Sequence, residues 1–195
     1  MANVTTGEVR LSYVNLFQAR GINGSEPKFS VTLLIPKSDV ATKAAIDKAI
    51  EEAAQDGTVN KWNGVRPPKM ATPLHDGDGV RQSDGMPFGE ECKGHWVMTA
   101  NCSENRPPQV VGLDRQPIVN QSDVYSGMYG YVNINFFAYN SNGRKGIGCG
   151  LNAVMKSREG EVLGGGVVDV NEAFKNVAAA PVPAARINPL TGQVM

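Results

Sequence analysis

The 195-residue sequence lacks any apolar run that approaches the roughly 20 residues a membrane helix needs. Its opening residues, 1–6, have neither a basic head nor an apolar stretch, so we expect no signal peptide. The three cysteines, Cys92, Cys102 and Cys149, are odd in number and lie far apart. This pattern argues against a disulfide framework and indicates reduced thiols in a cytoplasm.

The sequence also lacks the short motifs of common enzyme classes, such as GxSxG, the Walker phosphate loop and HExxH. Cys92 and His95 stand at a CxxH spacing, but no second pair stands at a recognised zinc-ligand spacing. His75 and the nearby aspartates would suit an acidic nuclease centre, yet the glycines between them are explained more simply by turns. We therefore expect a binding protein with no catalytic residue, metal or other cofactor.

The net charge is zero, which usually argues against nucleic-acid binding, but the charges are segregated. Residues 1–37 carry four basic and two acidic side chains (net +2), and residues 93–156 carry six and three (net +3). Residues 38–92 carry six and ten (net −4), and residues 157–195 carry three and four (net −1). Phosphate binding depends on the local field of a groove, so a neutral chain can still bind nucleic acid.

Alternation of apolar and polar residues predicts a β-rich chain. The first strand covers residues 8–13, with Val9, Leu11 and Tyr13 on its inner face. Further strands are expected over 28–35, which Pro36 ends, then 95–102, 109–113, 128–140 and 145–156. The Asn142-Gly143 pair between the last two is typical of a hairpin turn.

One helix is expected over residues 39–55, capped by Ser38 or Asp39 and stopped at Asp56-Gly57. Residues 57–94 are rich in glycine and proline and predict a long functional loop. Five main strands with one helix favour an all-β fold, a five-stranded barrel with long loop insertions. We expect one domain over residues 1–175 and a flexible tail over 176–195.

The strand over 128–140 carries the strongest functional signal. Its core face is apolar, whereas the other face holds two asparagines and four aromatics: Tyr129, Tyr131, Phe137 and Tyr139. Flat rings with polar edges are what single-stranded bases stack on. The same rings would also suit a surface that packs under the long loop or against a second subunit.

The partner strand adds to this signal. Gly146, Gly148 and Gly150 lie on one face, which would let a flat ligand or another backbone approach, or would serve barrel curvature. Arg144 and Lys145 stand at the entrance, placed to meet phosphates. Weaker candidates for DNA binding lie elsewhere: Trp62, which could equally anchor its own loop, and the two basic residues Arg106 and Arg115.

In their order, these segments resemble a phage family long labelled as a domain of unknown function, similar to OB-fold single-stranded-DNA-binding proteins of tailed phages. The resemblance is carried by residues 8–17, 28–37, 127–139 and 146–154. It implies an OB-fold barrel that binds single-stranded DNA without sequence specificity, without cofactor, during replication, recombination or repair in the host cytoplasm. The binding residues carried over are those on the matching hairpin: Tyr129, Tyr131, Phe137, Tyr139, Arg144 and Lys145.

The expected partners are single-stranded DNA and replication or recombination proteins, with no membrane and with a weak homo-oligomer left open. The last twenty residues hold one charge, Arg186, whereas many such proteins end in an acidic tail, so tail-mediated recruitment is not expected. The competing interpretation is a phage assembly protein whose aromatic face is a subunit interface.

Overall fold

The computed structural model describes residues 2–21 and 23–164. The predicted tail and its boundary at residue 175 lie outside the described residues. The helices are α1 (Val40–Asn60) and the short 3-10 helices η1 (Glu90–Cys92) and η2 (Gln121–Asp123). The strands are β1 (Ala2–Thr5), β2 (Val9–Arg20), β3 (Lys28–Pro36), β4 (Leu74–Asp76), β5 (His95–Ser103), β6 (Gln109–Val111), β7 (Tyr129–Ser141) and β8 (Arg144–Arg158).

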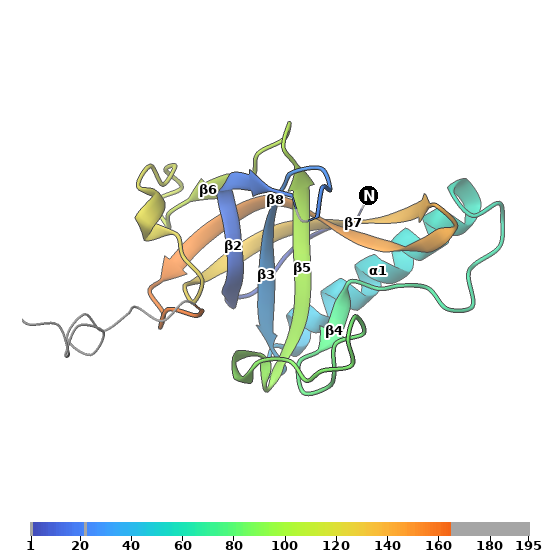
Figure 1. Cartoon of the computed structure of the whole chain (residues 1–195), viewed down its shortest axis with the longest axis horizontal. Helices are drawn as coiled ribbons and strands as arrows, with labels where there is room; N and C mark the ends of the chain where they lie inside the picture. The colour runs from blue at the N-terminus through green and yellow to red at the C-terminus, as the bar shows by residue number, and fades with distance from the viewer. Residues whose placement is uncertain (1, 22, 165–195) are drawn as a thin grey trace, which may run out of the picture. The chain divides into compact units, whose positions relative to one another are not determined.

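Five of the strands close into a barrel (Figure 1). The ring runs β7-β2-β3-β5-β8 and closes because β8 also pairs with β7 along nearly its whole length. The pairings in the ring are antiparallel except for the short parallel contact between Asn101 of β5 and Gly150 of β8. This arrangement, with one α-helix in the described residues, confirms the predicted all-β barrel.

The remaining strands border the ring. β1 pairs with β7, β4 pairs with β5, and β6 runs parallel to β8. The distal half of the β7–β8 hairpin extends past the barrel beside α1 (Figure 1). α1 is too polar to span a membrane, and the described residues hold no helix that is long and apolar enough to do so.

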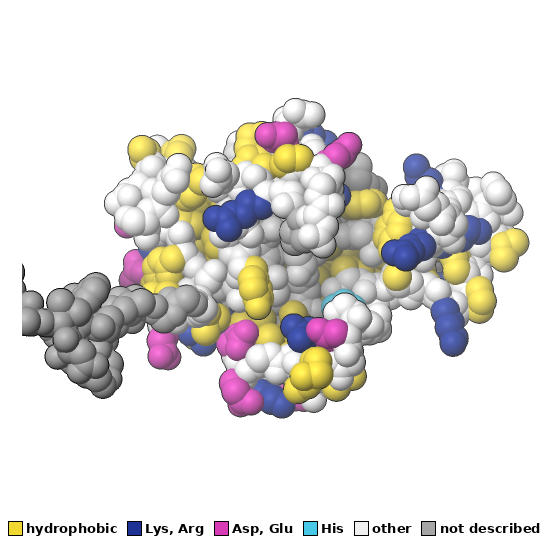
Figure 2. Space-filling model, viewed as in Figure 1, with side chains coloured by type: hydrophobic (Ala, Val, Ile, Leu, Met, Phe, Trp, Pro, Cys, Tyr) yellow, Lys and Arg dark blue, Asp and Glu magenta, His cyan; other side chains and the backbone are white. Residues whose placement is uncertain are grey.

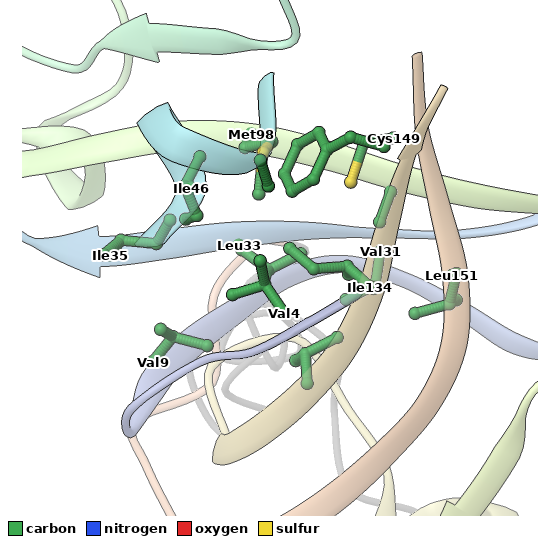
Figure 3. Packing of buried hydrophobic residues seen from close by; sticks show 14 of the residues in the cluster. Val4, Val9, Val31, Leu33, Ile35, Ile46, Met98, Ile134, Cys149 and Leu151 are labelled. Atoms are coloured by element: carbon green, nitrogen blue, oxygen red, sulfur yellow. The ribbon is translucent and has the colours of Figure 1, made fainter. Parts of the chain in front are cut away.

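The barrel interior is built by the alternation read from the sequence. Phe29, Val31, Leu33 and Ile35 of β3 are all buried, as predicted. In the predicted strand 128–140 every position of the core face, from Met128 to Ala138, is buried. Figure 3 shows these strands meeting Met98 of β5 and side chains of α1 and β8 in one interior. Each buried aliphatic side chain contributes about 1.5–3 kcal/mol to folding.

The first strand departs from the prediction at Tyr13. Val9 and Leu11 are fully buried, but Tyr13 is 70% exposed and has a φ of 45°. The register between β2 and β3 shifts between Ser12 and Asn15, which is the mark of a β-bulge. Because the bulge adds a residue, it reverses the alternation and sends Tyr13 outward.

The helix begins as predicted but ends later. Asp39 caps it, and its carboxylate accepts a hydrogen bond from the Thr42 backbone nitrogen at 3.1 Å. The predicted stop at Asp56-Gly57 is wrong, because α1 continues to Asn60. A Cβ on Gly57 would lie 2.3 Å from the Cβ of Ala138, so this glycine allows α1 to approach the hairpin closely. It serves packing and does not end the helix.

Candidate nucleic-acid interface

The outer face of β7 carries the aromatic row that the sequence predicts. Tyr131 and Phe137 are 36% and 39% exposed, and Tyr139 is half-buried. Their neighbours Val132, Phe136 and Ala138 point into the core. The rings of Tyr131, Phe137 and Tyr139 therefore lie on one side of the sheet, and we call this surface the aromatic row.

The glycines of β8 lie beneath this surface. Phe137 stands opposite Gly148 in the ladder, and Tyr139 stands opposite Gly146. A Cβ on Gly148 would lie 2.6 Å from Phe137 Cζ, so the ring lies directly over the glycine. At Gly146 the close approach of another backbone, one of the predicted alternatives, is observed. There Ile147 donates its backbone hydrogen to the Ala71 carbonyl oxygen at 2.8 Å.

The middle of the row is held by amide side chains. Asn133 donates from Nδ2 to Thr5 Oγ1 at 2.8 Å and accepts from Asn152 Nδ2 at 2.8 Å. This chain of hydrogen bonds crosses β1, β7 and β8. Asn135 packs its amide over Gly150, whose Cβ would lie 2.4 Å from Asn135 Oδ1. The segment between Tyr131 and Phe137 is therefore fixed by cross-strand contacts.

Two cations stand at the turn of the hairpin, and the backbone of a third lies beside it. Arg144 and Lys145 were predicted, and Lys61 joins them because Asn140 Nδ2 donates to the Lys61 carbonyl oxygen at 3.5 Å. Within residues 2–21 and 23–164, none of the three forms an ion pair. Figure 2 shows blue side chains and no magenta ones at this end of the visible face. We call Lys61, Arg144 and Lys145 the basic tip.

Ion pairs neutralise part of the charge of the acidic segment 38–92. Lys37 binds both Asp76 and Asp78 at 2.6 Å, and this contact lowers the pKa of both carboxyl groups and raises the pKa of Lys37. Arg66 binds Glu51 through two hydrogen bonds of 2.7 and 2.8 Å, which lower the pKa of that carboxyl group. The cations of the basic tip lack such partners, so their field reaches solvent.

Trp62 does not offer its ring to a ligand. It is 1% exposed and packs beside Gly57, and its Nε1 donates to the Tyr139 carbonyl oxygen at 3.0 Å. The prediction that it stacks on a base is wrong, and the alternative that it anchors its own loop agrees with the structure. The sequence around Trp62 predicts a loop, but a loop prediction does not indicate whether a side chain is buried. Trp62 instead ties the end of α1 to the hairpin.

Tyr129 lies at the other end of β7, where cations occupy its ring. The guanidinium carbon of Arg158 lies 3.6 Å from the ring centroid, and that of Arg10 lies 5.7 Å away. Arg10 is itself held by a hydrogen bond of 2.8 Å to the Glu161 carbonyl oxygen. Ser157 Oγ donates to the Glu8 carboxylate at 2.6 Å and Arg158 Nε donates to it at 2.9 Å, and these hydrogen bonds lower the pKa of that carboxyl group. This ring is thus part of a structural cluster.

Arg106 and Arg115 lie away from the basic tip, in the exposed turns that precede and follow β6. β6 pairs with Ala153–Met155, and Met155 also stands opposite Tyr131. The two arginines therefore lie in the turns at the two ends of β6, which borders β8 opposite Tyr131, while the basic tip lies at the Tyr139 end of the aromatic row. Arg115 has a φ of 62°, a left-handed backbone conformation that is typical of a turn.

The cysteines and histidines do not assemble into a metal site. In the described part of the chain, no three His, Cys, Asp or Glu side chains are grouped so that they would hold an ion. Cys149 is buried in the barrel, and this burial raises the pKa of its thiol to about 12. Burial also raises the pKa of Cys92 and Cys102. These thiols belong to apolar packing.

Comparison with solved structures supports the fold. The single-stranded-DNA-binding protein of bacteriophage Enc34, solved in complex with single-stranded DNA, is 29% identical, with a TM-score of 0.70. The alignment covers 84% of this chain and 90% of that one. The bacteriophage T7 single-stranded-DNA-binding protein gp2.5 is 16% identical over 94% of this chain and 98% of its own, with a TM-score of 0.56. The likeness to gp2.5 concerns the fold alone. Together, the two structural comparisons confirm the predicted OB-fold.

Sequence comparison leads to the same group. A curated relative, the putative protein p50 of Acyrthosiphon pisum secondary endosymbiont phage 1, is 29% identical over 177 residues, which is 87% of this chain and 91% of the relative. Residues 2–181 match the family model described as Enterobacter phage Enc34, ssDNA-binding protein. Members of such a family are binding proteins and not enzymes, as the sequence predicts. The chain belongs to the family of the Enterobacter phage Enc34 single-stranded-DNA-binding protein.

Proposed function

We propose that this protein binds single-stranded DNA, without sequence specificity, on the outer face of the β7–β8 hairpin. The observation that carries the proposal is the aromatic row, in which Tyr131, Phe137 and Tyr139 lie outward on one strand. The basic tip stands at one end of the row, and Arg106 and Arg115 lie in the turns before and after β6, which borders β8. The Enc34 protein, solved in complex with single-stranded DNA, supports the assignment.

The proposed mechanism is stacking of bases on the exposed rings. Phe137 and Tyr139 are two residues apart on one strand, which separates them by about 6.7 Å. Tyr131 is six residues from Phe137, or about 20 Å along the strand. Every base has a π-face, so stacking does not select a sequence, and it contributes about 1–3 kcal/mol per base. Paired bases are already stacked inside a duplex, so the same surface favours single strands.

The cations supply the second part of the mechanism. Lys61, Arg144 and Lys145 would contact phosphates, which fix the strand on the surface but carry no sequence information. Three phosphate contacts to a single strand predict a slope of about −2 in log K against log salt. The net charge of zero implies a weak general field, so stacking carries more of the affinity than charge does.

The biological role that follows is protection and handling of single strands in phage DNA replication, recombination or repair, in the cytoplasm of the host. A protein that coats exposed bases without reading them suits all three processes. Replication or recombination enzymes would then be its protein partners.

The test is a titration of the full chain with fluorescein-labelled oligo-dT and with a duplex of equal length, followed by anisotropy at several salt concentrations. We expect tighter binding to the single strand and a slope near −2. Equal binding of the duplex at moderate salt would refute the stacking mechanism. A stable oligomer in size-exclusion chromatography that ignores DNA would favour the assembly-protein interpretation.

A further inference from the structure

Phe137 and Gly148 form the closest ring-to-glycine contact on the hairpin. They are direct partners in the β7–β8 ladder. A Cβ on Gly148 would lie 2.6 Å from Cζ, 2.7 Å from Cε2 and 3.3 Å from Cε1 of Phe137. Three atoms of the ring thus lie within van der Waals distance of where a side chain would begin. The ring occupies the space that the glycine leaves.

This contact sets the orientation of the ring. Side chains in strands ordinarily stand roughly perpendicular to the sheet, and a neighbour with a Cβ keeps them there. Opposite a glycine, an aromatic side chain can fold down onto the backbone. This arrangement of an aromatic residue over a glycine recurs in β-sheets. One face of the ring then rests on the strand and the other faces solvent. An open, fixed face is what a base requires for stacking.

We propose that Gly148 is a positioning residue for DNA binding, which holds the Phe137 ring flat so that its outer face receives a base. This inference rests on the proposed function and deepens it. The glycine does not touch the DNA itself; it acts only through Phe137. A ring already fixed in its bound orientation loses less side-chain freedom when the base arrives.

Gly148 is the cleanest of the three glycines on which to test this. At Gly146 a Cβ would lie 2.7 Å from the Ala71 carbonyl oxygen as well as from the Tyr139 hydroxyl, so alanine there would disturb the backbone. At Gly148 the nearest atoms all belong to the far end of the exposed Phe137 side chain. The ring can move aside at little cost to the fold, and its movement is the intended perturbation.

The alternative is that Gly148 serves only the stability or curvature of the sheet. Gly148→Ala separates the two roles. Its φ is not in the left-handed region, so alanine is compatible with the backbone. We expect the thermal midpoint to stay the same or rise slightly, because alanine reduces the freedom of the unfolded chain. We expect the dissociation constant for oligo-dT to rise about three- to tenfold, since the ring loses its fixed orientation.

A matched control is Gly89→Ala. A Cβ on Gly89 would also meet only the end of a flexible side chain, the Glu91 carboxylate at 2.3 Å, and the Gly89 φ is −61°. Gly89 precedes η1 and is not on the hairpin, so this variant should bind oligo-dT as the wild type does. A loss of affinity in both variants would assign the effect to glycine replacement in general and overturn the proposal.

The decisive measurement is a double-variant cycle with Phe137→Ala. If Gly148 acts through the ring, Gly148→Ala should weaken binding in the wild-type background and have no further effect in the Phe137→Ala background. An equal loss in both backgrounds, or no loss in either, would overturn the positioning role even if the wild type binds single strands tightly. A wild type without preference for single strands would overturn the proposed function and the positioning role together.

Discussion

Phe136 and Phe137 are adjacent phenylalanines with opposite environments, and they allow stability to be separated from binding. Phe136 is 1% exposed in the core, whereas Phe137 is 39% exposed on the aromatic row. Phe136→Ala removes a core side chain and should destabilise the fold by about 3–5 kcal/mol. Phe137→Ala leaves the core intact and should change the free energy of unfolding by less than about 1 kcal/mol.

For DNA binding the order should reverse. Loss of the Phe137 ring removes one stacking partner, worth about 1–3 kcal/mol, which corresponds to a roughly 5- to 160-fold rise in the dissociation constant. Oligo-dT anisotropy at fixed salt measures this rise, and urea denaturation of the same preparation measures stability. Phe137→Tyr keeps a flat ring and should restore most of the affinity. If folded Phe137→Ala bound oligo-dT as tightly as the wild type, the assignment of the aromatic row would be refuted.

Three further predictions concern the surroundings of the row. Trp62→Ala should lower the free energy of unfolding, measured in urea, by about 3–5 kcal/mol because the indole is buried. In a Trp96→Phe variant, where Trp62 is the remaining tryptophan, oligo-dT should leave the tryptophan emission unquenched. Equal stability of Trp62→Ala and the wild type would contradict the anchoring role. The double variant Arg144→Ala, Lys145→Ala should make the slope of log K against log salt shallower by about 1.4, since each lost phosphate contact removes about 0.7. An unchanged slope would show that the DNA phosphates bind elsewhere. Lys37 lowers the pKa of the two aspartates that it binds, so their contribution to stability is present above the ordinary value of 3.8 and is lost as the pH falls through the lower, folded values. The thermal midpoints of Lys37→Met and the wild type should therefore differ at pH 7 and converge at the acid end, and a constant difference would rule out this linkage.

The sequence predicts the barrel well where one face of a strand is buried. The alternation on β3 and β7 identifies the core face of each strand correctly, because a one-residue slip would expose that whole face. Tyr13 escapes the prediction because a β-bulge depends on the pairing with β3, which local alternation does not encode. Gly57 escapes it for a similar reason: a glycine that ends a helix and one that admits a neighbouring strand look alike in sequence.

The sequence predicts which aromatic rings of the candidate site point outward, but it does not predict the contacts that Trp62 and Lys61 make with the hairpin. The outward direction of Tyr131, Phe137 and Tyr139 follows from the period of two. The burial of Trp62 and the position of Lys61 beside the hairpin turn arise from contacts between residues nearly 80 positions apart, such as Trp62 with Tyr139 at a separation of 77. No local pattern carries that information. Cations on the ring of Tyr129 likewise come from β2 and β8.

Single-stranded DNA is proposed to lie on the outer face of the β7–β8 hairpin, and its position there can be mapped. Photocrosslinking of the full chain to an oligo-dT that carries 5-iodo-deoxyuridine, followed by mass spectrometry of the linked peptides, locates the DNA directly. We expect links at Tyr131, Phe137 or Tyr139, and unlabelled oligo-dT should remove them by competition. Specific links confined to other strands, with β7 unmodified, would contradict this proposal.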